Sequence, residues 1–354
     1  MTLLLASVLL GIIPMVIYAL IVWHLDRWEK EPLHLMIAAF VWGFLPSAVF
    51  AIIAQAILDL PIRTTEPPSL TVELYSASIV APLTEEFIKG LGVLLVFIIF
   101  RNEIDSVLDG LVYGSMVGFG FSAVENILYF STQPDAASLL FLFVLRAIVF
   151  GMLHALFTGL FGVGLALGKF SRSFSGKLLW PLLGLALAMV THAMHNYFAT
   201  VGGETIFLAF LGVACGVIWF VGTVCVCLYH ENRWIRIYLS DEVDRGVLHA
   251  NQAIDAATFS ARGIPGMFRH GLGDYLKRRR LLARATKLAY QKRLEARLGP
   301  TPARHRLLEK LRAEVSKLSG IDPLLTSGRI VATQSLPPPL PPLRRMPPSL
   351  PERG

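Results

Sequence analysis

Charged and imidazole side chains interrupt segments of this sequence that are otherwise almost wholly apolar. An acidic or basic side chain at the centre of a membrane helix costs about 2.5–3.5 kcal/mol on insertion scales. Contact with lipid is therefore too costly for these groups, and we expect them to meet in the interior of a helix bundle. The group comprises Glu85, Glu86, Lys89, Glu125, Arg146, His154, His192 and His195.

Helical spacing predicts that these side chains share interior faces. Lys89 lies three residues after Glu86 and four after Glu85, so its ammonium can neutralise a carboxylate from the next helical turn. Asn196 lies four residues after His192, on the same face of its helix. We interpret Lys89 and Asn196 as catalytic-site residues that tune charge and hydrogen bonding.

Several carboxylates and two histidines in a dry interior are the ingredients of a hydrolytic metal site. Catalytic zinc takes imidazole and carboxylate ligands and keeps one position for a water, whose pKa falls toward about 7. We expect Glu125, His154 and His192 to be the metal ligands. Either Glu85 or Glu86 can then take the proton from the attacking water.

The composition places these groups in a membrane protein. Hydrophobic residues make up 54% of the 354 residues, charged residues make up 16%, and the mean hydropathy is +0.59. Soluble domains carry about 25% charged residues, so this chain has too few to cover a water-facing surface. The three cysteines lie in one apolar stretch and predict helix packing rather than a disulfide framework.

We predict an all-α, polytopic transmembrane bundle with about seven spans. A helix needs about 20 apolar residues to cross the hydrocarbon core. Lysines and arginines in the loops after the first, third and fifth spans outnumber those in the alternate loops by six to one. The positive-inside rule then puts the N-terminus outside the cell membrane and the C-terminus in the cytoplasm. The predicted spans are 1–23, 34–58, 74–100, 106–130, 139–168, 178–200 and 205–229.

The net charge of +7 lies mainly in the tail, after residue 230. We divide the chain into a transmembrane domain (1–229), a basic helical tail (230–320) and a proline-rich, disordered end (321–354). Residues 275–297 hold nine Lys or Arg and one acid, a pattern typical of a basic amphipathic helix. We expect this tail to meet an anionic lipid surface and not nucleic acid.

Four strings of this sequence resemble the motifs of the PrsW family of intramembrane proteases. EEFIKG at 85–90 looks like its EExxK motif, and Phe121 with Glu125 looks like its FxxxE. HALFTGLFG from His154 and HAMHN at 192–196 resemble its two histidine segments. The resemblance spans about 85–200 and implies a peptidase that cuts single-pass membrane proteins, such as anti-sigma factors, on their extracytoplasmic side.

The same strings are also similar, more distantly, to the CAAX-type prenyl endopeptidases. His192 and Asn196 fit the HxxxN of those enzymes, for which a glutamate-activated water without a metal has been proposed. A metal-free, glutamate-dependent protease is therefore one alternative to a zinc enzyme. Buried Glu, Lys and His chains also serve as ion relays, so a proton-coupled transporter is another, as is a noncatalytic membrane scaffold. We expect Arg146 to pair with a carboxylate or to extend its side chain toward the membrane surface.

Overall fold

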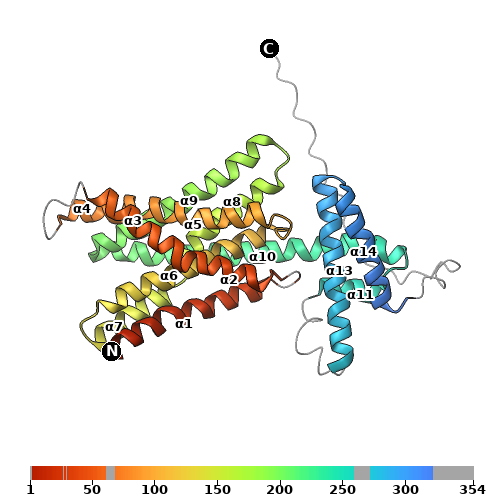
Figure 1. Cartoon of the computed structure of the whole chain (residues 1–354), viewed down its shortest axis with the longest axis horizontal. Coiled ribbons are helices and arrows are strands. Elements are labelled where there is room, and N and C mark those ends of the chain that lie inside the picture. The colour runs from red at the N-terminus through yellow and green to blue at the C-terminus, as the bar shows by residue number, and fades with distance from the viewer. Residues whose placement is uncertain (1, 27, 29, 61–67, 259–271, 322–354) are drawn as a thin grey trace, which may run out of the picture. The chain divides into compact units, whose positions relative to one another are not determined.

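The computed structural model describes residues 2–26, 28, 30–60, 68–258 and 272–321. Within these ranges the regular structure is entirely helical, which confirms the predicted all-α class (Figure 1). The chain divides into two compact units, Met1–His230 and Glu231–Gly354. This division lies beside the boundary that we placed at 229/230, and the proline-rich segment from 322 to 354 lies outside the described residues.

Six helical stretches of the described chain are long and apolar enough to cross a membrane. They are Leu3–Leu25, Leu33–Asp59, Val107–Ser131, Ala136–Phe170, Phe174–Val201 and Gly203–Asp244. The seventh predicted span, 74–100, falls on a continuous helical run from Leu70 to Ile99. That run holds Glu85, Glu86 and Lys89 close together, so its composition alone does not mark it as a span.

Several of these stretches are built from more than one helical element, because short π-helical turns interrupt them. The elements of the first unit are α1 (Thr2–Leu25), α2 (Leu33–Trp42), η1 (Gly43–Ser47), α3 (Ala48–Asp59), α4 (Leu70–Tyr75), η2 (Ser76–Val80), α5 (Ala81–Ile99), α6 (Val107–Ser131), α7 (Ala136–Phe143), η3 (Val144–Val149), α8 (Leu153–Phe170), α9 (Phe174–Val201), η4 (Gly203–Thr205) and the first part of α10 (Ile206–Asp244). The segments η1, η2 and η3 are the π-helical turns.

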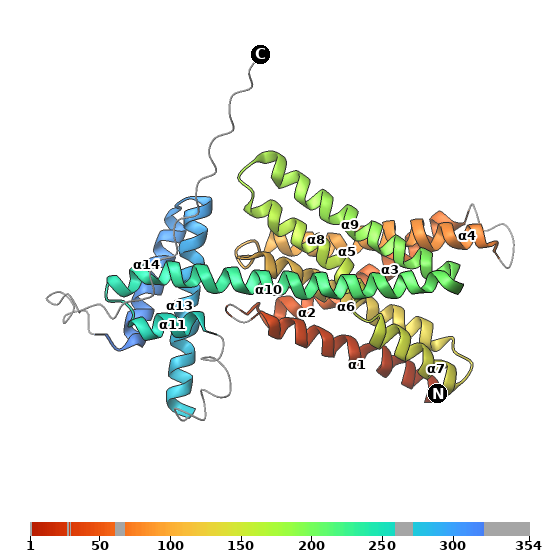
Figure 2. The same cartoon turned by 180° about the vertical axis from the view of Figure 1, so that it is seen from behind.

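Helix α6 is the buried centre of the first unit. Within its apolar window 89% of residues are buried, against at most 33% in the other five stretches, whose outer faces are free to meet lipid. It packs against α1, α2 and α8. Helix α10 lies beside α8, where Gly216 faces Leu156 (Figure 2).

Glycines let α6 and α8 approach until their backbones touch. A Cβ added to Gly110 would lie 2.3 Å from the carbonyl oxygen of Gly162, and one added to Gly118 would lie 2.4 Å from that of His154. Small residues of this kind allow close helix contacts in membranes, where water supplies no hydrophobic force between helices. The contact at Gly118 sets the distance of His154 from α6.

The second unit contains the end of α10, from Glu231, and the helices α11 (Ala250–Ala257), α13 (Leu272–Leu298) and α14 (Pro302–Ser319). The apolar face of α13 packs against α11 and α14, with Leu281, Leu282 and Leu288 buried. Glu242 is fully buried and accepts hydrogen bonds from Lys292 Nζ at 2.8 Å and Arg312 Nε at 3.1 Å. The apolar side of the predicted amphipathic helix is therefore occupied inside this unit, and charged side chains form its free surface.

We expect Gly162→Ala to destabilise the first unit, because the new methyl group would lie 1.9 Å from the Gly110 carbonyl oxygen. Overpacking of this kind costs about 1–3 kcal/mol. Thermal unfolding of the purified protein in detergent measures the loss. Gly212→Ala on α10 is the matched control, since no atom lies within 4 Å of the added Cβ. Equal effects of the two substitutions would contradict the packing that we describe.

Candidate active site

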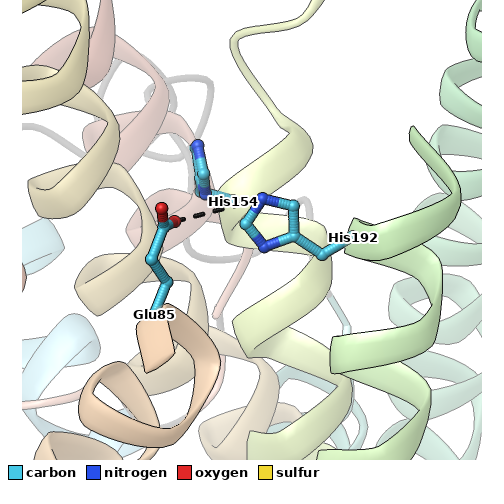
Figure 3. Close-up of side chains that lie close together, drawn as sticks. All are labelled: Glu85, His154 and His192. Atoms are coloured by element: carbon cyan, nitrogen blue, oxygen red, sulfur yellow. Dashed lines mark ion pairs between the residues drawn. The ribbon is translucent and has the colours of Figure 1, made fainter. Parts of the chain in front are cut away.

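Four helices bring the predicted site residues together inside the first unit. Helix α5 carries Glu85, Glu86 and Lys89, while α6 carries Glu125, α8 carries His154, and α9 carries His192 and Asn196. Glu85, His154 and His192 point toward one another from three different helices (Figure 3). The convergence that we inferred from the cost of burying these groups is therefore present.

Glu86 is a fully hydrogen-bonded carboxylate. Its Oε1 accepts from Lys89 Nζ at 2.5 Å and from His192 Nδ1 at 2.9 Å, and its Oε2 accepts from Thr158 Oγ1 at 3.1 Å. Glu86 and Lys89 are 1% and 0% exposed. Hydrogen bonds to the ionised form and an adjacent ammonium both favour the charged carboxylate.

Glu85, although adjacent in the chain, keeps one oxygen free. Its Oε1 accepts a hydrogen bond from Gln55 Nε2 at 3.0 Å. Its Oε2 is enclosed and has no hydrogen-bond partner among the described residues. The nearest charged or imidazole nitrogens are Lys89 Nζ at 3.7 Å and His192 Nε2 at 4.0 Å. An enclosed acceptor without a donor is costly, so this oxygen is the part of the site that needs a further partner.

His154 is held through both ring nitrogens. Its Nε2 lies 2.6 Å from Glu125 Oε2, and its Nδ1 lies 3.0 Å from Lys89 Nζ. Because an ammonium only donates, Nδ1 accepts and Nε2 carries the proton that goes to Glu125. Arg146 Nη2 holds the same Glu125 oxygen at 2.9 Å, which confirms the expected pairing of this arginine with a carboxylate.

The two histidines are thus each backed by a carboxylate, Glu86 behind His192 and Glu125 behind His154. Carboxylates in this position orient imidazoles that bind metals. Glu85, His154 and His192 each offer one donor atom, and these three atoms lie within 4.8 Å of one another. Ligand atoms around zinc lie about 3.4 Å apart, so binding would require side-chain rotation and the release of His154 Nδ1 by Lys89.

The donor types, the burial and the free Glu85 Oε2 fit a divalent ion. In the described part of the chain Glu125 does not belong to this group of three, since it pairs with Arg146 and His154. Glu85 therefore stands in the place where the sequence led us to expect Glu125. The roles of the individual residues remain predictions.

A cavity of about 560 Å³ reaches the site. Glu85, Glu125, His154 and His192 line it, together with Asn196 and Gln55. The Asn196 Nδ2 donates to the Ala77 carbonyl oxygen at 2.8 Å and so fixes η2 beside the cavity. His195 also lines the cavity and packs its ring edge-on against Phe150, with centroids 5.0 Å apart.

Two residues of the site were not predicted from the sequence, Gln55 and Thr158, each of which donates to one of the paired glutamates. Gln55 is detectable in principle, because it is the only carboxamide in the apolar segment 33–59 and such a group needs a polar partner inside a membrane. Thr158 carries no such signal, since a threonine hydroxyl can bond its own helix.

Residues 31–225 match the PrsW family intramembrane metalloprotease family. The chain belongs to this family. It is 29% identical over 173 residues to Protease PrsW of Geobacillus kaustophilus, covering 49% of this chain and 70% of the relative. It is 30% identical over 168 residues to Protease PrsW of Oceanobacillus iheyensis, covering 47% and 71%. No solved structure matches the chain.

Membership in the PrsW family confirms the resemblance drawn from the four strings and makes the chain an intramembrane protease. The matched region contains every predicted site residue, from Glu85 to Asn196. Helices α11, α13 and α14 lie outside it. The buried carboxylates and histidines therefore lie in the part of the chain that matches the family.

We expect the two histidines to carry their protons on opposite nitrogens. His154 donates from Nε2 to Glu125, whereas His192 donates from Nδ1 to Glu86. Nitrogen-15 NMR of chelator-treated protein with labelled histidine measures the tautomers, and His154→Gln and His192→Gln variants assign the signals. Two rings in the same neutral tautomer would contradict the hydrogen bonding described here.

Proposed function

We propose that this chain is a zinc-dependent intramembrane endopeptidase in which Glu85 takes the proton from the attacking water. The observation that carries the assignment is the free Oε2 of Glu85, enclosed in the site and 4.0 Å from His192 Nε2. A single water with hydrogen bonds of about 2.8 Å to each atom fits such a gap. Without a bound ion, Glu85 and His192 would hold this water between them; with zinc bound, His192 Nε2 would be a ligand and Glu85 would hold the nucleophile.

The hydrogen bonding favours Glu85 over Glu86 as the base. Both oxygens of Glu86 already accept hydrogen bonds, and Lys89 stabilises its charge at 2.5 Å. A carboxylate satisfied in this way has little affinity for a further proton. We therefore assign to Glu86 the orientation of His192, to Glu125 the orientation of His154, and to Lys89 the neutralisation of the glutamate pair.

His154 and His192 would hold the metal ion, with Glu85 as the neighbouring carboxylate. A bound zinc ion supplies a water of lowered pKa and polarises the carbonyl of the scissile peptide. This proposal moves Glu125 from the ligand role, expected from the sequence, to the support of His154. It rests on the grouping of the donor atoms, on the free Glu85 oxygen and on the family's description.

For substrates we propose single-pass membrane proteins, anti-sigma factors among them, cut toward the outer half of the bilayer. The cavity within the helix bundle supports a membrane segment as the substrate. We further propose that the N-terminus faces outward and the tail faces the cytoplasm. There, exposed cations such as Arg279, Arg280 and Lys310 would meet anionic lipid through charge alone.

The base assignment predicts that Glu85→Gln abolishes cleavage while leaving the fold intact. The carboxamide keeps the size of the side chain but cannot take a proton, and loss of a general base costs about 10²- to 10⁴-fold in rate. The assay uses purified protein in proteoliposomes with a panel of doubly tagged single-pass membrane proteins that includes anti-sigma factors. Glu204→Gln, on the exposed turn η4, is the matched control. Cleavage by Glu85→Gln at the wild-type rate would refute the assignment.

The metal assignment predicts about one equivalent of zinc per chain in purified protein. Chelation should stop cleavage, and added zinc should restore it. His154→Ala and His192→Ala should lose the metal, whereas Glu85→Gln should retain it, because we place Glu85 on the water. Elemental analysis of each variant measures the content. Undiminished cleavage by metal-free protein would replace the zinc enzyme with a metal-free, glutamate-dependent one.

A further inference from the structure

Gln55 lines the cavity, and the proposed function gives this residue no role. It lies on α3, outside the four strings that resemble family motifs, and its side chain is only partly exposed. Its Nε2 donates to Glu85 Oε1 at 3.0 Å and lies 3.5 Å from Thr84 Oγ1. Gln55 therefore touches the residue to which we assign the proton transfer.

The contact with Glu85 determines which way the carboxamide faces. An ionised carboxylate only accepts hydrogen bonds, so the Gln55 atom against it must be the NH₂ group and the carbonyl oxygen must point elsewhere. That oxygen, Gln55 Oε1, has no hydrogen-bond partner among the described residues, and unlike Glu85 Oε2 it is not fully buried. It is a neutral acceptor on a residue that lines the cavity.

A membrane substrate needs such an acceptor. Peptide hydrolysis requires the transmembrane helix to unwind locally, which frees backbone N–H groups that the helix had paired. Each free group costs several kcal/mol in a dry environment unless it finds a partner. Among the acceptors that line the cavity, Gln55 Oε1 belongs to the residue that contacts Glu85, the proposed base. Gln55 Oε1 is suited to accept a backbone N–H.

We propose that Gln55 is a substrate-positioning residue with two functions. Its amide N–H fixes Glu85 Oε1, and its carbonyl oxygen binds one backbone N–H of the substrate segment unwound in the cavity. This inference rests on the proposed function, because it places the substrate backbone beside Glu85. It adds a residue of α3 to a site otherwise built from α5, α6, α8 and α9.

A methylation scan combined with Gln55→Met tests the proposal. The substrates are peptides that span the cleaved segment of one of the tagged membrane proteins that the wild type cuts. Each peptide carries a single N-methyl group, and the methylated backbone nitrogen shifts by one residue from peptide to peptide. In the wild type, one position near the scissile bond should lose about 2- to 12-fold in kcat/KM beyond its neighbours, the range for one neutral hydrogen bond. In Gln55→Met that extra loss should disappear, since the acceptor is gone.

Gln55→Met should also lower kcat by removing the donor that holds Glu85. Gln133→Leu, a carboxamide in the turn after α6, is the matched control and should keep the wild-type kcat and methylation profile. Gln55→Asn, shorter by one methylene, provides a second variant if methionine disturbs folding, and it should also lose the position-specific effect. Identical profiles in wild type and Gln55 variants would overturn the proposal. If the wild type cuts no member of the panel, the proposed function itself fails.

Discussion

Buried carboxylates stay ionised inside a membrane protein only when a cation is held against them, and Lys89 supplies that cation. It is fully buried, lies 2.5 Å from Glu86 and 3.7 Å from Glu85, and donates to His154 Nδ1 at 3.0 Å. Removing one partner of a buried pair costs about 3–5 kcal/mol, because the other charge is left without compensation. One ammonium thereby links the glutamate pair of α5 to the histidine of α8.

The helix geometry gives adjacent glutamates different neighbours. Successive side chains on an α-helix point about 100° apart, so Glu86 reaches Thr158 on α8 and His192 on α9, while Glu85 reaches Gln55 on α3. Both oxygens of Glu86 accept hydrogen bonds, and one of these bonds holds His192. Glu85 keeps one oxygen without a hydrogen-bond partner. The different neighbours of two identical residues are the basis for the different functions that we propose for them.

Close backbone packing brings His154 against α6. The glycines of α6 bring α8 against it at His154, and the central position of α6 lets Glu125 reach that ring. The site also lies among irregular turns: η2 precedes α5, and η3 with its Arg146 precedes α8. Irregular backbone at membrane depth is tolerated where it is buried in protein or lines a cavity, as both segments do here.

The sequence was sufficient to predict the all-α membrane class, most of the spans and the residues whose burial demands partners. Those properties depend on insertion cost and helical period, which are local to each segment. The predicted span at 74–100 shows the limit of composition, because Glu85, Glu86 and Lys89 keep this helical run outside a hydropathy criterion. The four strings placed Glu85, Lys89, His154 and His192 in one site before any geometry was known.

Only the tertiary structure put Glu85, rather than Glu125, in the group of three donors that could hold a metal ion, and only it added Gln55 and Thr158. It likewise showed that the apolar face of α13 is occupied by α14. Each of these results depends on how a helix is rotated and which neighbour it meets. Rotation is set by contacts between segments far apart in the chain, and the spacing of residues within one segment does not contain that information.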